Sequence, residues 1–387
     1  MNEQKKYKNL DLRSYGMVAA LVFIFGLFYF LSNGANATPS NINNLIMQNG
    51  YIIILATGML LCVLTGNIDL GVGSVVALCA ASAGKLVMEQ GWPVPLAWLI
   101  ALFIGFVVGL FAAFFIAYLS IPPFVVTLAT MLMGRGLTYT MLASQTVGPL
   151  PKSYTQIGAG FLPNIKVGGI DAVCVIVAII ATVLIVISEY NQIRTNKKYG
   201  FANVYPWQLI IKNIVILAIL WFFFLSLGRK SGIPIQLVVA GVIVALYQFI
   251  TSKTVAGRQI YALGGNAKAA RLSGINTKKV FFWIYVNMGL LSAVAGIILS
   301  ARQGAANPKM GDGVELDAIG ACYIGGAAAA GGVGTVMGAV IGALVMGVLN
   351  NGMSIIGLPT DFQKVVKGAV LLGAVTLDVL SKKRKEA

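Results

Sequence analysis

Residues 94–119 read VPLAWLIALFIGFVVGLFAAFFIAYL, a stretch without a single charged side chain. As an α-helix this stretch would be about 39 Å long, at about 1.5 Å per residue. The hydrocarbon core of a bilayer is about 30 Å thick, so the stretch is long enough to cross it. Pro93 and Pro95 stand at its beginning, where proline fits the first turn of a helix. The stretch therefore predicts a membrane-spanning helix.

The rest of the chain repeats this pattern. Of its 387 residues, 58% are hydrophobic and only 10% are charged, whereas charged residues make up about 25% of a typical soluble protein. Further apolar stretches follow one another with short breaks, at 15–31, 43–64, 70–88, 123–143, 170–188, 209–227, 233–251, 280–301, 316–332, 334–349 and 362–380. Residues 1–387 are thus predicted to form a single transmembrane domain, an all-α polytopic membrane protein.

The number of spanning helices depends on three of these stretches. Residues 70–88, 316–332 and 334–349 are short or rich in glycine, which is typical of half-helices and re-entrant segments. We therefore expect about 10–12 transmembrane helices. The first stretch, 15–31, follows a basic start and resembles a signal peptide, but it is about long enough to span, and a retained helix is favoured over a cleaved one.

The positions of Lys and Arg predict the orientation. An even number of spans places the N-terminal tail, residues 189–208, residues 252–279 and the C-terminal tail on one side, and these four segments contain most of the 28 Lys and Arg residues. Cytoplasmic segments of membrane proteins carry such an excess. Both termini, a basic insertion at 189–208 and a loop at 252–279 are therefore expected to be cytoplasmic. Arg229 and Lys230 are the exception, because they lie in a segment that this orientation places outside.

Several kinds of function are disfavoured by what the sequence lacks. It contains no histidine and no phosphate-binding loop of the form GxxxxGK(S/T). The four cysteines are scattered within apolar stretches without metal-ligand spacing, and the basic residues do not form a nucleic-acid-binding helix. We expect no catalytic residue, no metal, no cofactor and no nucleic-acid partner. The acidic residues lie near the ends of spans, which also disfavours a proton-coupled carrier.

Residues 252–279 contain the sharpest local pattern, GRQIYALGGN at 257–266 followed by AKAARLSGI at 267–275. Asn266 is a plausible N-cap after a glycine turn, residues 267–272 are helix formers, and Ser273 with Gly274 would end the helix. A short helix with small residues outside the membrane suits docking in a groove of a partner protein. An ordinary loop turn is the alternative that periodicity alone leaves open.

The string at 257–275 closely resembles the cytoplasmic loop of the ribose/xylose/galactose-type permeases of ATP-binding-cassette (ABC) importers. Other strings resemble landmarks of that family in the same order: IDLGVGS at 68–74, IPPFVVTL at 121–128, ELDAI at 315–319, YIGG at 323–326, GGVG at 331–334, LNNG at 349–352 and VKG at 366–368. The resemblance covers about 45–380. The extra region around 165–232 makes the chain similar to the xylose-type or multiple-monosaccharide-type branch.

The resemblance implies a permease subunit in a bacterial-type cell membrane that works with a separate ABC ATPase and an extracytoplasmic monosaccharide-binding protein. A second permease copy is expected, most simply as a homodimer. The resemblance also implies that the cytoplasmic loop contacts the ATPase, through Gly264, Gly265, Asn266, Ala269, Ala270, Arg271, Ser273 and Gly274. An ion-coupled secondary sugar carrier is the alternative function. The identity of the sugar stays open.

Neutral or acidic polar residues in short, glycine-broken spans are candidates for the translocation pathway, although each is more often an ordinary contact between helices. They are Asn49, Asn67, Asp69, Thr127, Thr130, Asn287, Tyr323 and Asn350. Asp361 and Lys364, three residues apart near a span end, are a local ion pair or a docking point for the binding protein. The acid-and-glycine segments at 69–73 and 315–320 also suggest an inverted repeat of 43–143 and 280–380.

Overall fold

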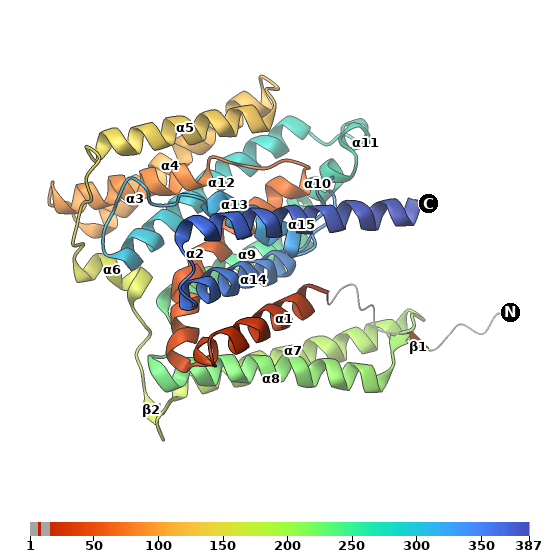
Figure 1. Ribbon diagram of the computed structural model, residues 1–387. Helices are drawn as coiled ribbons and strands as arrows, with labels where there is room; N and C mark the ends of the chain where they lie inside the picture. Colours follow the sequence, from red (N-terminus) through yellow and green to blue (C-terminus); the bar gives the residue numbers. More distant parts are fainter. Residues whose placement is uncertain (1–6, 9–15, 387) are drawn as a thin grey trace.

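The computed structural model describes residues 7–8 and 16–386 (Figure 1). The short strands are β1 (Tyr7–Lys8), β2 (Lys166–Val167), β3 (Ile170–Asp171) and β4 (Asn203–Val204). The helices are α1 (Gly16–Leu31), η2 (Ala35–Ala37), α2 (Pro39–Leu64), α3 (Val72–Met88), α4 (Val94–Ala117), α5 (Pro123–Met141), α6 (Lys152–Ala159), α7 (Ala172–Lys198), α8 (Pro206–Lys230), α9 (Ile235–Lys253), α10 (Val255–Gly265), α11 (Ala267–Leu272), α12 (Thr277–Gln303), α13 (Val314–Ile324), α14 (Val336–Ile355) and α15 (Thr360–Glu386).

A helix occupies the position of every predicted span. Among the described residues, seven helices are long and apolar enough to cross a membrane, namely α2, α4, α7, α8, α9, α12 and α14. The chain is an all-α polytopic membrane protein, as the sequence predicts. Figure 1 shows α11 and the end of α15 at one end of the bundle, and α6 and the β2 hairpin at the opposite end. We call the first the cytoplasmic end and the second the outer end, following the distribution of Lys and Arg.

The apolar stretch 316–332 does not form one spanning helix. Helix α13 has only 11 residues and rises about 16 Å, half of a hydrocarbon core. It ends just before Gly326, whose φ of +81° is one that residues with a Cβ rarely adopt, and Gly331 and Gly332, with φ of +84° and +75°, keep the following residues from resuming it. The half-helix alternative raised by the glycine content is therefore the one the structure adopts.

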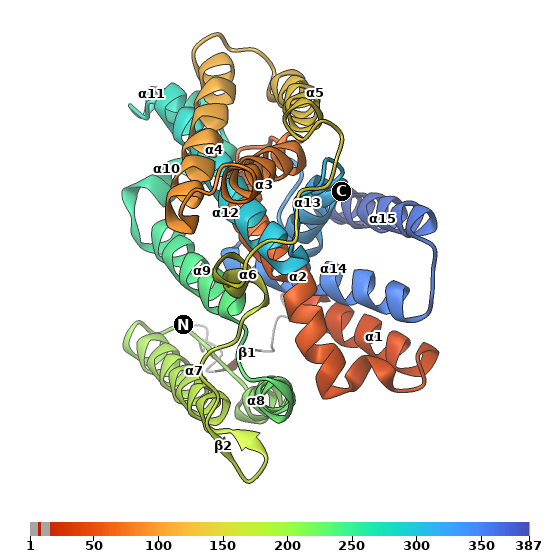
Figure 2. The same cartoon turned by 90° about the vertical axis from the view of Figure 1, so that its left-hand side faces the viewer.

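Helix α12 forms the centre of the bundle and packs against α2, α3 and α4 (Figure 2). Its contact with α4 is made backbone to backbone, because Gly105 and Gly289 face one another. A Cβ added at Gly289 would lie 2.3 Å from the Gly105 carbonyl oxygen, and a Cβ at Gly105 would lie 2.5 Å from the Gly289 carbonyl oxygen. Small residues at such crossings let membrane helices approach closely.

The helix contacts recur in the two halves of the chain. Helix α12 packs on α3 and α4, whereas α2 packs on α13 and α14. In the same way α3 contacts α5, and α13 contacts α15. This correspondence pairs α2–α5 with α12–α15 in chain order, which is the arrangement that the inverted-repeat hypothesis expects. Superposition of residues 43–143 on 280–380 with opposite orientation is the measurement that decides it.

Helices α7 and α8 form a hairpin at the edge of the bundle in both views (Figures 1 and 2). Only 11% and 6% of the apolar parts of α7 and α8 are buried, so most of their side chains face away from the rest of the bundle. The first half of the basic insertion 189–208 is the extension of α7 to Lys198, and its second half is the turn to α8. Lys212 of α8 forms an ion pair with Glu189. The insertion therefore lengthens a helical hairpin beyond the expected spans.

Candidate functional site

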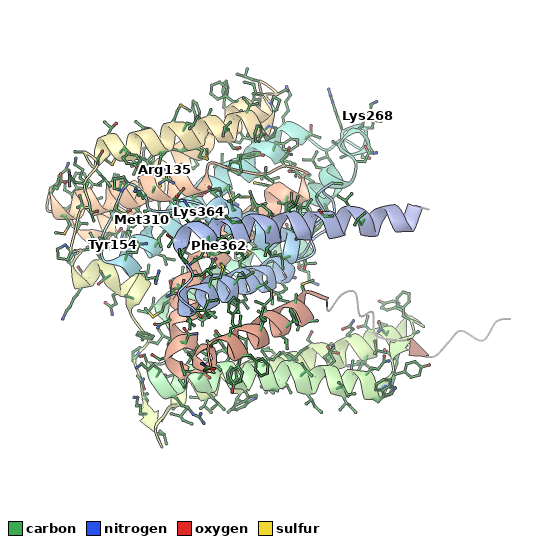
Figure 3. The ribbon with its side chains drawn as sticks, viewed as in Figure 1. Arg135, Tyr154, Lys268, Met310, Phe362 and Lys364 are labelled. Atoms are coloured by element: carbon green, nitrogen blue, oxygen red, sulfur yellow. The ribbon has the colours of Figure 1, made fainter. Side chains whose placement is uncertain are left out.

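Helix α11 is the first candidate site and lies at the cytoplasmic end, where Figure 3 labels Lys268. The Asn266 side-chain oxygen accepts a hydrogen bond from the Ala269 backbone N–H at 2.9 Å, which caps the helix. Gly274, with φ +84°, follows its last turn. The predicted cap and end of this helix are confirmed. The prediction of a glycine turn before this helix is wrong, because Gly264 and Gly265 are the last residues of helix α10.

Burial divides the residues predicted to contact the ATPase. Ala270 is 4% exposed and packs inward, and Gly264 is partly buried. The exposed ones are Gly265, Asn266, Ala269, Arg271, Ser273 and Gly274. Leu272, which the sequence pattern did not single out, is 87% exposed. It lies four residues after Lys268 and hence on the same face of α11. The sequence signal that could have identified Leu272 was a large apolar residue in a short helix expected to lie outside the membrane.

Gly264 connects α10 to the membrane bundle. A Cβ at Gly264 would lie 1.7 Å from the Leu64 carbonyl oxygen at the end of α2, and 2.7 Å from the Gly332 nitrogen. The Gly332 N–H donates to the same Leu64 oxygen at 2.8 Å. The Tyr261 hydroxyl of α10 donates to the Gly334 carbonyl at 2.7 Å. The end of α10, the end of α2 and residues 331–334 thus form a backbone contact, which we call the glycine junction.

The start of α3 brings three predicted pathway residues together. The buried Asp69 carboxylate accepts a hydrogen bond from the Gly71 N–H at 2.8 Å. A Cβ at Gly71 would lie 3.2 Å from both Asp69 Oδ1 and the Thr130 methyl group of α5, and 3.3 Å from the Thr127 carbonyl oxygen. Asp69, Thr127 and Thr130 therefore share one small neighbourhood between α3 and α5. Both threonine hydroxyls donate within their own helix.

A second polar group lies at the start of α13. The Lys367 ammonium of α15 is 3.0 Å from both carboxylate oxygens of Asp317, and Asn350 of α14 donates to Asp317 at 3.3 Å. The Asp317 side chain is only 4% exposed. Asn350 was a predicted pathway residue, whereas Asp317 and Lys367 were not. An acid and a base near the ends of two short spans were the signal for them.

The starts of α3 and α13 adjoin, which places the two polar groups on neighbouring elements. A Cβ at Gly73 would lie 2.3 Å from both the Gly311 carbonyl oxygen and a carboxylate oxygen of Glu315. Helix N-termini carry partial positive charge, so acidic side chains are stabilised beside them. Broken helices of this kind are tolerated within membranes where they are buried in protein or line a cavity.

The other predicted pathway residues lie elsewhere. Asn49 donates to Leu45 and Gly347 backbone oxygens, so it links α2 with α14. Asn67 bonds within the turn after α2. Asn287 accepts a hydrogen bond from Tyr247 of α9. Tyr323 is half-buried near the end of α13. The structure therefore does not gather all eight residues into one site.

The outer end of α15 does not contain the local ion pair considered from the sequence. Lys364 instead contacts Asp312, at 2.9 Å, and both side chains are about 60% exposed (60% and 61%). The hydrogen bond from Lys364 holds the pKa of the Asp312 carboxyl below its ordinary value. Nearby, Arg135 of α5 donates to the Pro308 and Met310 carbonyls, each at 2.8 Å (Figure 3). Asp361 is exposed.

Comparison with known proteins places this bundle in a family. Residues 41–375 match the family model described as branched-chain amino acid transport system / permease component. The xylose transport system permease protein XylH of Escherichia coli K12 is 36% identical over 97% of this chain and 94% of its own, and that of Haemophilus influenzae is 38% identical over 98% and 99%. The ribose import permease protein RbsC of Escherichia coli K12 is 33% identical over 88% and 86%.

No solved structure matches the chain. The family model nevertheless spans all helices from α2 into α15, and the relatives align over nearly the full length. This multi-pass membrane protein therefore belongs to the family of transport-system permease components that the model describes.

Proposed function

We propose that this chain is the membrane-spanning subunit of an ATP-driven importer that translocates a monosaccharide, such as xylose or another pentose or hexose. The observation that carries the substrate class is the near full-length similarity to permeases named for xylose and ribose. The subunit itself is non-catalytic, and a separate ABC ATPase hydrolyses ATP. An extracytoplasmic binding protein delivers the sugar to the outer end.

The docking point for the ATPase is helix α11 within the segment 252–279. The exposed Leu272 supports this role, because an apolar side chain buried in a partner's pocket contributes much of the affinity of such interfaces. The glycine junction supports it as well. Displacement of α10 and α11 would act directly on the backbone at the end of α2 and on residues 331–334.

The pathway runs past the adjoining starts of α3 and α13, with Asp69, Thr127, Thr130 and Asn350 beside it. The polar groups there are gathered from four helices, which supports this placement. At the outer end, Lys364 and the exposed Asp361 dock the binding protein. Two copies of the chain form the transporter, because each of two ATPase domains needs one docking helix.

Uptake in proteoliposomes tests the function. The chain, its partner ATPase and its binding protein are reconstituted, and entry of labelled xylose is measured with and without ATP. We expect uptake to require ATP and to be lost when residues 266–274 are scrambled, with membrane insertion intact. Uptake that persists without ATP and follows an ion gradient would instead establish the ion-coupled secondary carrier.

Replacing Leu272 by Ser tests the docking helix separately. Removal of an apolar anchor is expected to weaken binding of the ATPase at least about tenfold, as is typical of interface hot spots. Val255, 58% exposed at the start of α10, provides the matched control, and Val255→Ser is expected to leave binding unchanged. Binding is measured by retention of the purified ATPase on the permease in detergent. Equal loss in both variants would contradict a specific role for Leu272.

A further inference from the structure

A cavity of about 660 Å³ opens near the cytoplasmic end, between α9, α10 and α12. It lies on a different group of helices from the proposed pathway at α3 and α13. Its wall is mainly apolar and includes Leu61, Ile250, Val280 and Ile284. Trp283 also lines it and is 54% exposed. Tryptophan in this position is typical of the level of lipid headgroups.

The cytoplasmic rim of the cavity is polar and cationic. Gln259, Asn276 and Lys279 line it, and no carboxylate is among its lining residues. The surrounding sequence has the same character, because residues 190–311 contain no Asp or Glu at all. A cavity with an apolar wall and a cationic cytoplasmic rim is complementary to an amphiphile with a negatively charged head.

The start of α12 adds a second argument for an anion. Lys278 and Lys279 stand in the first turn of this helix, where the helix dipole disfavours positive charge. The Asn276 side chain caps this start by accepting a hydrogen bond from the Lys279 backbone N–H at 3.0 Å. The other N–H groups of the first turn also favour negative charge. A bound anion would be attracted by the dipole and by Lys279, which lines the cavity, and it would offset the repulsion between Lys279 and its neighbour Lys278.

From the cavity and its charge we infer that this site binds an anionic phospholipid of the cytoplasmic leaflet, with the phosphate at Lys279 and an acyl chain along the apolar wall. Basic pockets between membrane helices on the cytoplasmic side recognise such headgroups. The floor of the cavity holds Asn287, which accepts a hydrogen bond from Tyr247 and whose amide nitrogen has no partner. A polar ligand would use that floor, whereas an acyl chain would not.

Quenching of Trp283 fluorescence by brominated lipids tests the inference. The chain is reconstituted in vesicles of brominated phosphatidylglycerol or brominated phosphatidylcholine, and the Trp283 signal is the difference from a Trp283→Phe variant. We expect phosphatidylglycerol to be preferred about fivefold over phosphatidylcholine, the effect of one lysine near an anionic surface. Equal quenching by both lipids would overturn the proposal, because it would indicate ordinary surrounding lipid.

Two variants identify the groups responsible. Lys279→Gln is expected to abolish the preference, and Lys268→Gln, which removes a cation on α11 outside the cavity, is expected to keep it. A Tyr247→Phe/Asn287→Leu double variant makes the floor apolar and is expected to retain the preference. Loss of the preference in Lys268→Gln would show a diffuse charge effect, and loss in the double variant would show that the floor formed by Tyr247 and Asn287, and not Lys279, binds the headgroup. Either result would refute the lipid site.

Discussion

Gly264→Ala is expected to abolish ATP-dependent uptake, whereas Gly265→Ala, at an exposed position of the predicted ATPase contact, is expected to reduce it far less. The added methyl group at Gly264 would lie 1.7 Å from the Leu64 carbonyl oxygen, which is rigid backbone, whereas a Cβ at Gly265 meets nothing within 4 Å. Overpacking of a well-packed site typically costs about 1–3 kcal/mol. The strain would separate α10 from α2 and residues 331–334.

The pair of glycines makes this comparison sharp. Both are in the last turn of α10, and both substitutions favour the helix by about 1 kcal/mol, so helix propensity is matched. Uptake of labelled xylose and stimulation of the partner ATPase are measured at equal amounts of inserted protein. If Gly264→Ala transports as well as Gly265→Ala, the glycine junction does not transmit movement.

Lys367→Met is expected to cause a large loss of stability. It would leave the Asp317 carboxylate, with its side chain only 4% exposed, without its cation. Breaking a buried ion pair by removing one partner typically costs about 3–5 kcal/mol. The double variant Asp317→Asn/Lys367→Met removes both charges and is expected to recover most of the loss. Melting temperatures in detergent are the measurement.

The ion pair between Lys364 and Asp312 provides the control on the same helix. Both of these side chains are more than half exposed, and exposed pairs contribute little because water already solvates each charge. Lys364→Met should therefore melt close to the unchanged protein. A double variant at Asp317 and Lys367 that melts no higher than Lys367→Met would refute the proposed cause.

The sequence by itself determined where most of the membrane-spanning helices are. An apolar stretch of about 20 residues has no alternative to a helix in lipid, because every backbone hydrogen bond must be made internally. This rule placed stretches such as 94–119 and 233–251 without knowledge of their neighbours. Local rules also sufficed for α11, because an asparagine cap and a terminal glycine act within one turn of chain.

Only the tertiary structure decided which residues meet and which way they face. Asp317 and Lys367 are far apart in the chain but 3.0 Å apart in space, and Gly264 contacts the end of α2. Ala270 turns inward while Leu272 points outward, although both are small or apolar residues of one short helix. Composition indicates only whether a segment as a whole lies in lipid or in water. Contacts between distant segments depend on how closely whole helices approach. Here glycines allow the close approach, because they have no side chain to keep the neighbouring backbone away.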